Sequence, residues 1–207
     1  MPAEIDETSP FPRISDYYDR LVDRHGHDPR ACDYGHAESQ RIKFKVFSEM
    51  LDYSGMSVLD VGCGFADFAR FLEDRYEKVR YVGVDLSTRM ITDAKMFRPD
   101  LELRVGNILA EEGAEKFDVV IANGIFYLLG EHAPSLMANI VRRMFGLARI
   151  AVGFNTLSSW APYQEAGEFY ANPMDVLGLG RSLTSRLVLR HDYHPRDFTV
   201  YLYKQIL

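Results

Sequence analysis

The first residues in this sequence whose types and spacing suggest a binding site are two glycines between acidic residues. The segment LDVGCGFADF (59–68) contains Asp60, Gly62, Gly64 and Asp67. An apolar run ends here and a helical pattern begins, and glycines at such a turn let a ligand approach the backbone closely. A pyrophosphate at this turn would face carboxylates, whereas a cationic group would be attracted. The alternative is a tight turn between a strand and a helix that binds nothing.

Two further polar residues end the next predicted strands. Asp85 closes YVGVDL (81–86), where a carboxylate can accept hydrogen bonds from both hydroxyls of a ribose. Asn107 closes LELRVGN (101–107) and could accept from an adenine amino group, with Ile108 packed on the ring. Asp85 could instead cap the helix that starts near Ser87, and Asn107 could be a simple turn residue. Together with the acidic turn, these residues predict an adenosine ligand with a cationic end. S-adenosylmethionine is such a ligand, and NAD is not.

The elements that position these residues follow from an alternation of apolar runs and helical patterns. Strands are predicted over 57–61, 81–86, 101–107, 117–123 and 148–155, and helices over 40–53, 67–76, 87–96 and 134–145. This alternation predicts an α/β fold with a parallel sheet and helices on both faces. The segments 186–193 and 197–204 are separated by three residues, too few for a helical crossover. They predict an antiparallel hairpin at the edge of the sheet.

Residues 1–36 lie outside this alternating pattern. A helix is predicted over 14–21, with Asp16 as a possible cap, followed by a loop over 25–36. The segment has no evident role in the core, so it is predicted to be a helical lid over the strand ends, with Tyr17 or Tyr18 reaching the cofactor or the acceptor. Residues 37–207 are then predicted to form the ligand-binding domain.

Composition narrows the class of protein further. The chain has 207 residues, 47% of them hydrophobic, which suits one core. Its net charge of −6 gives no electrostatic attraction to nucleic acid. It contains neither a membrane-spanning apolar stretch nor a secretory signal pattern, so a cytoplasmic protein that binds neither nucleic acid nor membrane is predicted. Cys32, Cys63 and the histidines have no metal-ligand spacing, so no metal is predicted.

The motifs LDVGCGFAD, GVDLS, GNIL and FDVVIANGIF occur in an order and spacing that resembles the class I S-adenosylmethionine-dependent methyltransferases. The resemblance covers roughly residues 40–155. It implies a Rossmann-like, doubly wound sheet of about seven mostly parallel strands whose last strand is antiparallel. Three positions depart from the family pattern: Ala66 replaces a glycine, Asn107 replaces an aspartate, and a proline-glycine-glycine turn is missing at 144–148.

The same resemblance implies a set of cofactor-binding residues. Asp60, Gly62, Cys63 and Gly64 correspond to the site for the methionine end, and Asp85 to the ribose acid. The remaining positions flank the adenosine or lie beneath the sulfonium: Leu86, Met90, Asn107, Ile108, Asn123, Gly124 and Ile125.

The sequence does not identify a methyl acceptor or a general base. Tyr18, Tyr127 and His194 are weak catalytic candidates, while Gln40, Arg41 and Lys43 are interpreted as the solvated face of a helix. The leading hypothesis is methyl transfer to an oxygen or nitrogen of a small molecule, by a monomer or homodimer. Alternatives are a methyltransferase acting on protein or RNA, a non-catalytic protein that binds S-adenosylmethionine, and a nicotinamide-dependent reductase.

Overall fold

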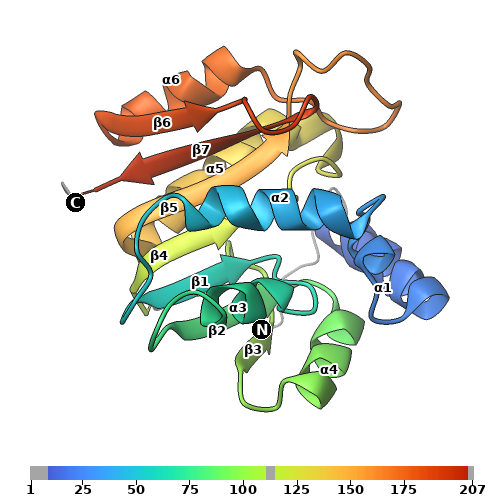
Figure 1. The fold of residues 1–207 in the computed structure, drawn as a ribbon. Coiled ribbons are helices and arrows are strands. Elements are labelled where there is room, and N and C mark those ends of the chain that lie inside the picture. Colours follow the sequence, from blue (N-terminus) through green and yellow to red (C-terminus); the bar gives the residue numbers. More distant parts are fainter. Residues whose placement is uncertain (1–8, 111–114, 205–207) are drawn as a thin grey trace, which may run out of the picture.

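The computed structural model describes residues 9–110 and 115–204, and it contains one seven-stranded sheet covered by helices (Figure 1). The strand order is β3-β2-β1-β4-β5-β7-β6. The predictions for residues 1–8, 111–114 and 205–207 lie outside the described residues. The predicted fold class is confirmed.

The first five strands are parallel and the last two are antiparallel to their neighbours. Their bounds are β1 Ser57–Val61, β2 Arg80–Asp85, β3 Glu102–Val105, β4 Phe117–Ala122, β5 Ala148–Leu157, β6 Arg186–Arg190 and β7 Asp197–Tyr203. The central strands are buried almost throughout, because helices cover both faces of the sheet. The predicted hairpin is confirmed: β7 pairs with β5, and β6 forms the sheet edge.

Two layers of helices enclose the sheet. The helices α2 (Ala37–Ser48), α3 (Asp67–Glu73) and α4 (Thr88–Phe97) share one apolar core with the sheet, whereas α5 (Ala133–Leu147) and α6 (Pro173–Leu183) share the other. Figure 1 shows α2 and α3 in front of the sheet and α5 behind it. The helix α6 was not predicted, because Gly178 and Gly180 lower its intrinsic helix propensity. Tertiary packing stabilises it instead: Gly180 lies against Leu202 of β7.

The N-terminal segment forms the helix α1 (Phe11–His25) and the short 3-10 helix η1 (Pro29–Cys32). The predicted start at residue 14 was wrong, because the backbone of Pro10 is already helical, so that the helix begins at Phe11 and Asp16 lies inside it. The expectation that this segment has no role in the core was also wrong. Ile14 packs in the same core as α5, and Val22 and Ala31 form a small cluster with Phe65 and Met90.

Candidate active site

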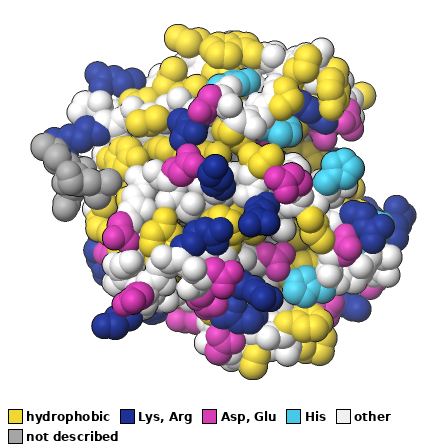
Figure 2. Space-filling view, in the orientation of Figure 1, with side chains coloured by type: hydrophobic (Ala, Val, Ile, Leu, Met, Phe, Trp, Pro, Cys, Tyr) yellow, Lys and Arg dark blue, Asp and Glu magenta, His cyan; other side chains and the backbone are white. Residues whose placement is uncertain are grey.

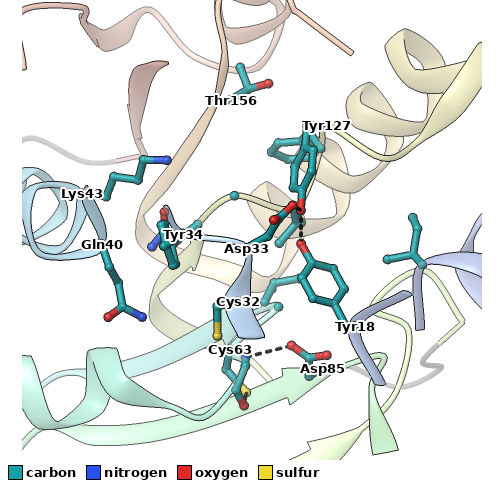
Figure 3. A pocket seen from close by; sticks show the side chains of 18 of the residues that line it. Tyr18, Cys32, Asp33, Tyr34, Gln40, Lys43, Cys63, Asp85, Tyr127 and Thr156 are labelled. Atoms are coloured by element: carbon teal, nitrogen blue, oxygen red, sulfur yellow. Dashed lines mark hydrogen bonds between the residues drawn. The ribbon is translucent and has the colours of Figure 1, made fainter. Parts of the chain in front are cut away.

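A cavity of about 400 Å³ lies at the carboxyl ends of the parallel strands, beneath α1 and η1. Its volume falls within the range of small-molecule sites, roughly 300–1,000 Å³. All twelve predicted cofactor-binding residues line it, as do Tyr18, Tyr127 and His194. Parallel strands that end at one edge of a sheet explain why residues so far apart in the sequence meet here. Figure 3 shows several of these side chains around the cavity.

Asp60 lines this cavity and has a carboxylate oxygen without a partner. It lies near the end of β1 and is only 3% exposed. Its Oδ2 accepts a hydrogen bond of 2.6 Å from the Tyr81 hydroxyl, whereas its Oδ1 is buried and has no partner. Burial raises the pKa of Asp60 to about 7, an effect that the Tyr81 hydroxyl opposes and the nearby Asp85 reinforces. A buried acceptor with an unused oxygen fits the ammonium group of a cofactor.

The glycine turn after β1 is shaped by neighbouring side chains as well as by backbone conformation. Gly62 has φ +73°, and a Cβ at this position would overlap Cγ2 of Ile125. A Cβ at Gly64 would lie 3.1 Å from Sγ of Cys32. Ala66, which replaces the family's usual glycine, keeps the left-handed conformation with φ +60°. The turn therefore requires glycine at Gly62 because Ile125 approaches it closely, a reason that the sequence did not indicate.

Asp85 holds two backbone segments together at the end of β2. Its Oδ2 accepts from the Gly64 amide and its Oδ1 from the Ser87 amide, both at 2.8 Å. Ser87 caps α4 by accepting from the Met90 amide, so Asp85 is not the helix cap. Burial raises the pKa of Asp85, although these backbone donors oppose the shift. Each carboxylate oxygen keeps a second lone pair, which can accept from a ribose hydroxyl.

Asn107 forms a turn, as its alternative interpretation proposed. Its Oδ1 accepts a hydrogen bond of 3.0 Å from the Leu109 amide. The second lone pair of this oxygen is still available to an adenine amino group. Ile108, which is buried, lies next to it in the cavity wall.

The loop after β4 is held by a residue that sequence reasoning missed as a functional side chain. Asn155 of β5 is fully buried and accepts from the Gly124 amide at 2.6 Å. Its amide nitrogen donates to Oδ1 of Asn123 at 2.7 Å. Asn155 therefore holds Asn123 and Gly124, the two residues that follow β4, in the cavity wall. Its position at the end of an apolar strand was the signal that could have identified it.

Three tyrosines and an aspartate join the N-terminal segment to the rest of the site. The hydroxyl of Tyr18 lies 2.8 Å from that of Tyr127, which donates to Oδ2 of Asp33 at 2.7 Å (Figure 3). Tyr17 also donates to Asp33, at 2.9 Å, and does not line the cavity. Burial raises the pKa of both Tyr18 and Tyr127, so both phenols remain protonated at neutral pH. They are therefore suited to hydrogen bonding and poorly suited to accepting a proton.

A second polar cluster lies where β5 and β7 meet the cavity and contains Lys43, Thr156, His194, Arg196 and Asp197, all of which line it. The carboxylate of Asp197 forms an ion pair with Lys43, whose Nζ lies 3.0 Å from Oδ1. Its Oδ2 lies 2.6 Å from Nδ1 of His194. Burial opposes ionisation of Asp197, but these two partners lower its pKa below the usual value.

This cluster corrects the interpretation of the helix that carries Lys43. Arg41 is exposed as predicted, but Gln40 and Lys43 line the cavity and Lys43 is only 8% exposed. Lys43 lies one turn before Phe47 on the buried stripe of α2, and this spacing was the signal that could have identified it.

Among the described residues, no group of three or more histidine, cysteine or acidic side chains is arranged to hold a metal. None of the described helices is long and apolar enough to cross a membrane. Basic and acidic side chains are intermingled on the face shown in Figure 2.

Comparison with known proteins agrees with this geometry. Residues 58–144 match the family model described as a methyltransferase domain. This segment extends from β1 into α5 and contains all twelve predicted cofactor-binding positions. Residues 58–144 are therefore similar to methyltransferase domains, the class of protein that the motifs of this sequence resemble.

Individual relatives share the fold more extensively than the sequence. A trans-aconitate 2-methyltransferase of Azoarcus sp. is 31% identical over 88 residues, which are 42% of this chain and 34% of that protein. A Mycobacterium tuberculosis protein is described by its name as a candidate methyltransferase, and the name gives no acceptor. It is 28% identical over 155 residues, which are 72% of this chain and 93% of that protein. The match thus spans about a third of the Azoarcus enzyme. Magnesium protoporphyrin IX methyltransferase from Synechocystis PCC 6803 with bound S-adenosylmethionine has a TM-score of 0.69 at 14% identity, covering 99% of this chain and all of that one.

Proposed function

We propose that this protein transfers a methyl group from S-adenosylmethionine to an oxygen or nitrogen of a small molecule. The observation that supports this most directly is the continuity of the cavity. It extends from Asp60 and Asp85, on the cofactor side, to the polar cluster where β5 and β7 meet the cavity. One continuous space therefore has room to bring a cofactor and an acceptor together.

The residues present fit the cofactor. The unpartnered Oδ1 of Asp60 suits an ammonium, and the remaining lone pairs of Asp85 suit the ribose hydroxyls. Met90 and Ile108 supply apolar surface for the adenine. When bound, S-adenosylmethionine supplies a methyl group on a positively charged sulfur, which is already activated for transfer.

The protein's own contribution is to position the acceptor and exclude water. Residues 10–36 serve as the lid: α1 is fastened by Ser15, which donates to the Leu86 carbonyl, and by Tyr18, which contacts Tyr127. Tyr18 and Tyr127 are neutral hydrogen-bonding groups that can orient an acceptor next to the cofactor. Direct attack in line with the departing sulfur then needs little more than correct placement.

A small acceptor is favoured over a protein or RNA because this lid lies over the site. Phe11, Ile14 and Tyr18 of α1, and Cys32 to His36 after it, form part of the cavity wall. A macromolecule would have to displace these residues, of which Ile14 is buried in the core. The lid does not have to move so far to admit a small molecule.

The test uses S-adenosylmethionine with an isotopically labelled methyl group. The purified protein is incubated with a cell extract that has been separated into a low-molecular-weight filtrate, a protein fraction and an RNA fraction. We expect label in a product of the filtrate, dependent on the protein. Label confined to the protein or RNA fraction would refute the small-molecule acceptor, and failure to bind S-adenosylhomocysteine in calorimetry would refute the cofactor assignment.

A further inference from the structure

We propose that the acceptor is an uncharged hydroxyl compound and that His194 removes the hydroxyl proton during transfer. This inference rests on the proposed function and names the acceptor class and the base. It draws on the cluster where β5 and β7 meet the cavity, none of which the family match includes, because the match covers residues 58–144.

His194 is oriented as a base by the residues behind it. Its Nδ1 lies 2.6 Å from Oδ2 of Asp197, a distance that requires a proton between the two atoms. Since Asp197 is ionised and held by Lys43, that proton belongs to Nδ1. The Arg196 amide also lies 3.2 Å from Nδ1, but it cannot donate to a protonated nitrogen and is the weaker contact. The other ring nitrogen, Nε2, has no partner among the described residues, and in the tautomer protonated only on Nδ1 it carries the lone pair that accepts a proton.

The charges of the cavity disfavour an acidic acceptor. Lys43 and Arg196 are the lysine and arginine side chains among the described residues of the wall, and both are already paired. Lys43 contacts Asp197, and Arg196 contacts Glu165 and Glu168. Six carboxyl groups line the same cavity: Asp33, Asp60, Asp67, Asp85, Glu168 and Asp197. A carboxylate acceptor would approach several like charges, whereas both cations of the wall already have carboxylate partners.

One of two unpartnered polar groups in the same cluster disfavours an ammonium. The Thr156 hydroxyl and the Arg196 Nε are buried and have no hydrogen-bond partner. Arg196 Nε can only donate, so it requires a group that accepts hydrogen bonds. An ammonium has no lone pair and cannot accept a hydrogen bond from this group. A neutral hydroxyl compound with a second oxygen can accept from Arg196 Nε and also has a hydroxyl proton for His194 to remove.

The transfer step balances with these groups. The acceptor oxygen forms a bond to the methyl carbon as the bond between that carbon and sulfur breaks, and the electron pair of the broken bond returns to sulfur. The hydroxyl proton passes to Nε2 of His194, and the resulting imidazolium is stabilised by Asp197. After the product leaves, His194 releases the proton to solvent.

The first experiment measures the tautomer of His194 and needs no acceptor. Nitrogen-15 NMR of the whole protein saturated with S-adenosylhomocysteine should show His194 with its proton on Nδ1 and a bare Nε2. His194→Gln identifies the signal by its loss, and His191→Gln is the matched control, because His191 is on the same hairpin but does not line the cavity. A proton on Nε2 would overturn the proposal.

The second experiment measures transfer to a panel of neutral phenols and alcohols, amines, and carboxylic acids. We expect methylation of hydroxyl compounds, and a loss of about 10²- to 10⁴-fold in kcat for His194→Ala, the typical contribution of a general base. Added imidazole should restore part of this activity, which it would not do if His194 were only structural. Affinity for S-adenosylhomocysteine should stay within about twofold in both histidine variants.

The outcomes separate this inference from the proposed function. Methylation of amines or carboxylic acids instead, full activity of His194→Ala, or no turnover of the hydroxyl compounds by a protein that binds S-adenosylhomocysteine would overturn the assignment of His194 and its acceptor class. Absence of S-adenosylhomocysteine binding would overturn the proposed function itself.

Discussion

Replacing Asp60 by asparagine should separate two effects of this buried carboxyl group: its effect on the stability of the fold and its effect on cofactor affinity. Folding raises the pKa of this carboxyl group from 3.8 to about 7, chiefly through burial. The unfolded chain therefore releases the proton at lower pH than the folded protein does. The contribution of the protonated carboxyl group to the free energy of unfolding is fully present below about pH 4. It decreases between about pH 4 and pH 7 and is lost above about pH 7. This change corresponds to about 4 kcal/mol at pH 8.

An asparagine side chain at this position keeps an oxygen to accept from Tyr81 and carries no charge, so the Asp60→Asn protein should not show this loss. We expect urea unfolding at pH 4 to give similar stabilities for the two proteins, and at pH 8 to show the variant more stable by up to about 4 kcal/mol. The same substitution should weaken S-adenosylhomocysteine binding at pH 8 by about 1.5–3 kcal/mol, or roughly 10- to 150-fold, because the ammonium loses an anionic partner. Equal pH profiles for the two proteins would refute the buried-carboxylate reasoning, and unchanged affinity would refute the ammonium contact.

Three further predictions concern the rest of the site. Asp85→Asn should weaken S-adenosylhomocysteine binding by about 1.5–3 kcal/mol in calorimetry; a lower melting temperature with unchanged affinity would mean that Asp85 only holds the turns at Gly64 and Ser87. Gly62→Ala should destabilise the fold by about 1–3 kcal/mol in urea unfolding, because of its positive φ and the Ile125 contact; if Ile125→Ala restores none of this loss, the contact is not the cause. Amide hydrogen exchange of residues 10–36 should slow when S-adenosylhomocysteine binds, and equal protection in both states would contradict a lid that closes further on the ligand.

The N-terminal segment differs from its sequence-based prediction because its burial depends on residues from other parts of the chain. Its polarity and turn formers suggested a cover without a core role, and the cavity wall does include Tyr18 and Ile14. The burial of Val22 and Ala31 was not visible, because the small cluster they form is completed by Phe65 and Met90 from distant parts of the chain. A sequence pattern reports which side of an element is apolar, but it does not report which partner that side meets.

The sequence by itself determined the alternation of strands and helices from β1 to β5, the terminal hairpin and the predicted residues that line one end of the cavity. These follow from local rules: apolar runs form the strands, glycines mark the turns, and polar residues such as Asp60, Asp85 and Asn107 stand where strands end. Only the tertiary structure decided the acceptor end. Lys43 meets Asp197, which also pairs with His194, because α2 packs against β5 and β7, an arrangement of segments more than 100 residues apart that no local spacing encodes. A lysine in a sequence is also interpreted as solvated unless its partner is known, because burial of an unpaired charge is strongly unfavourable.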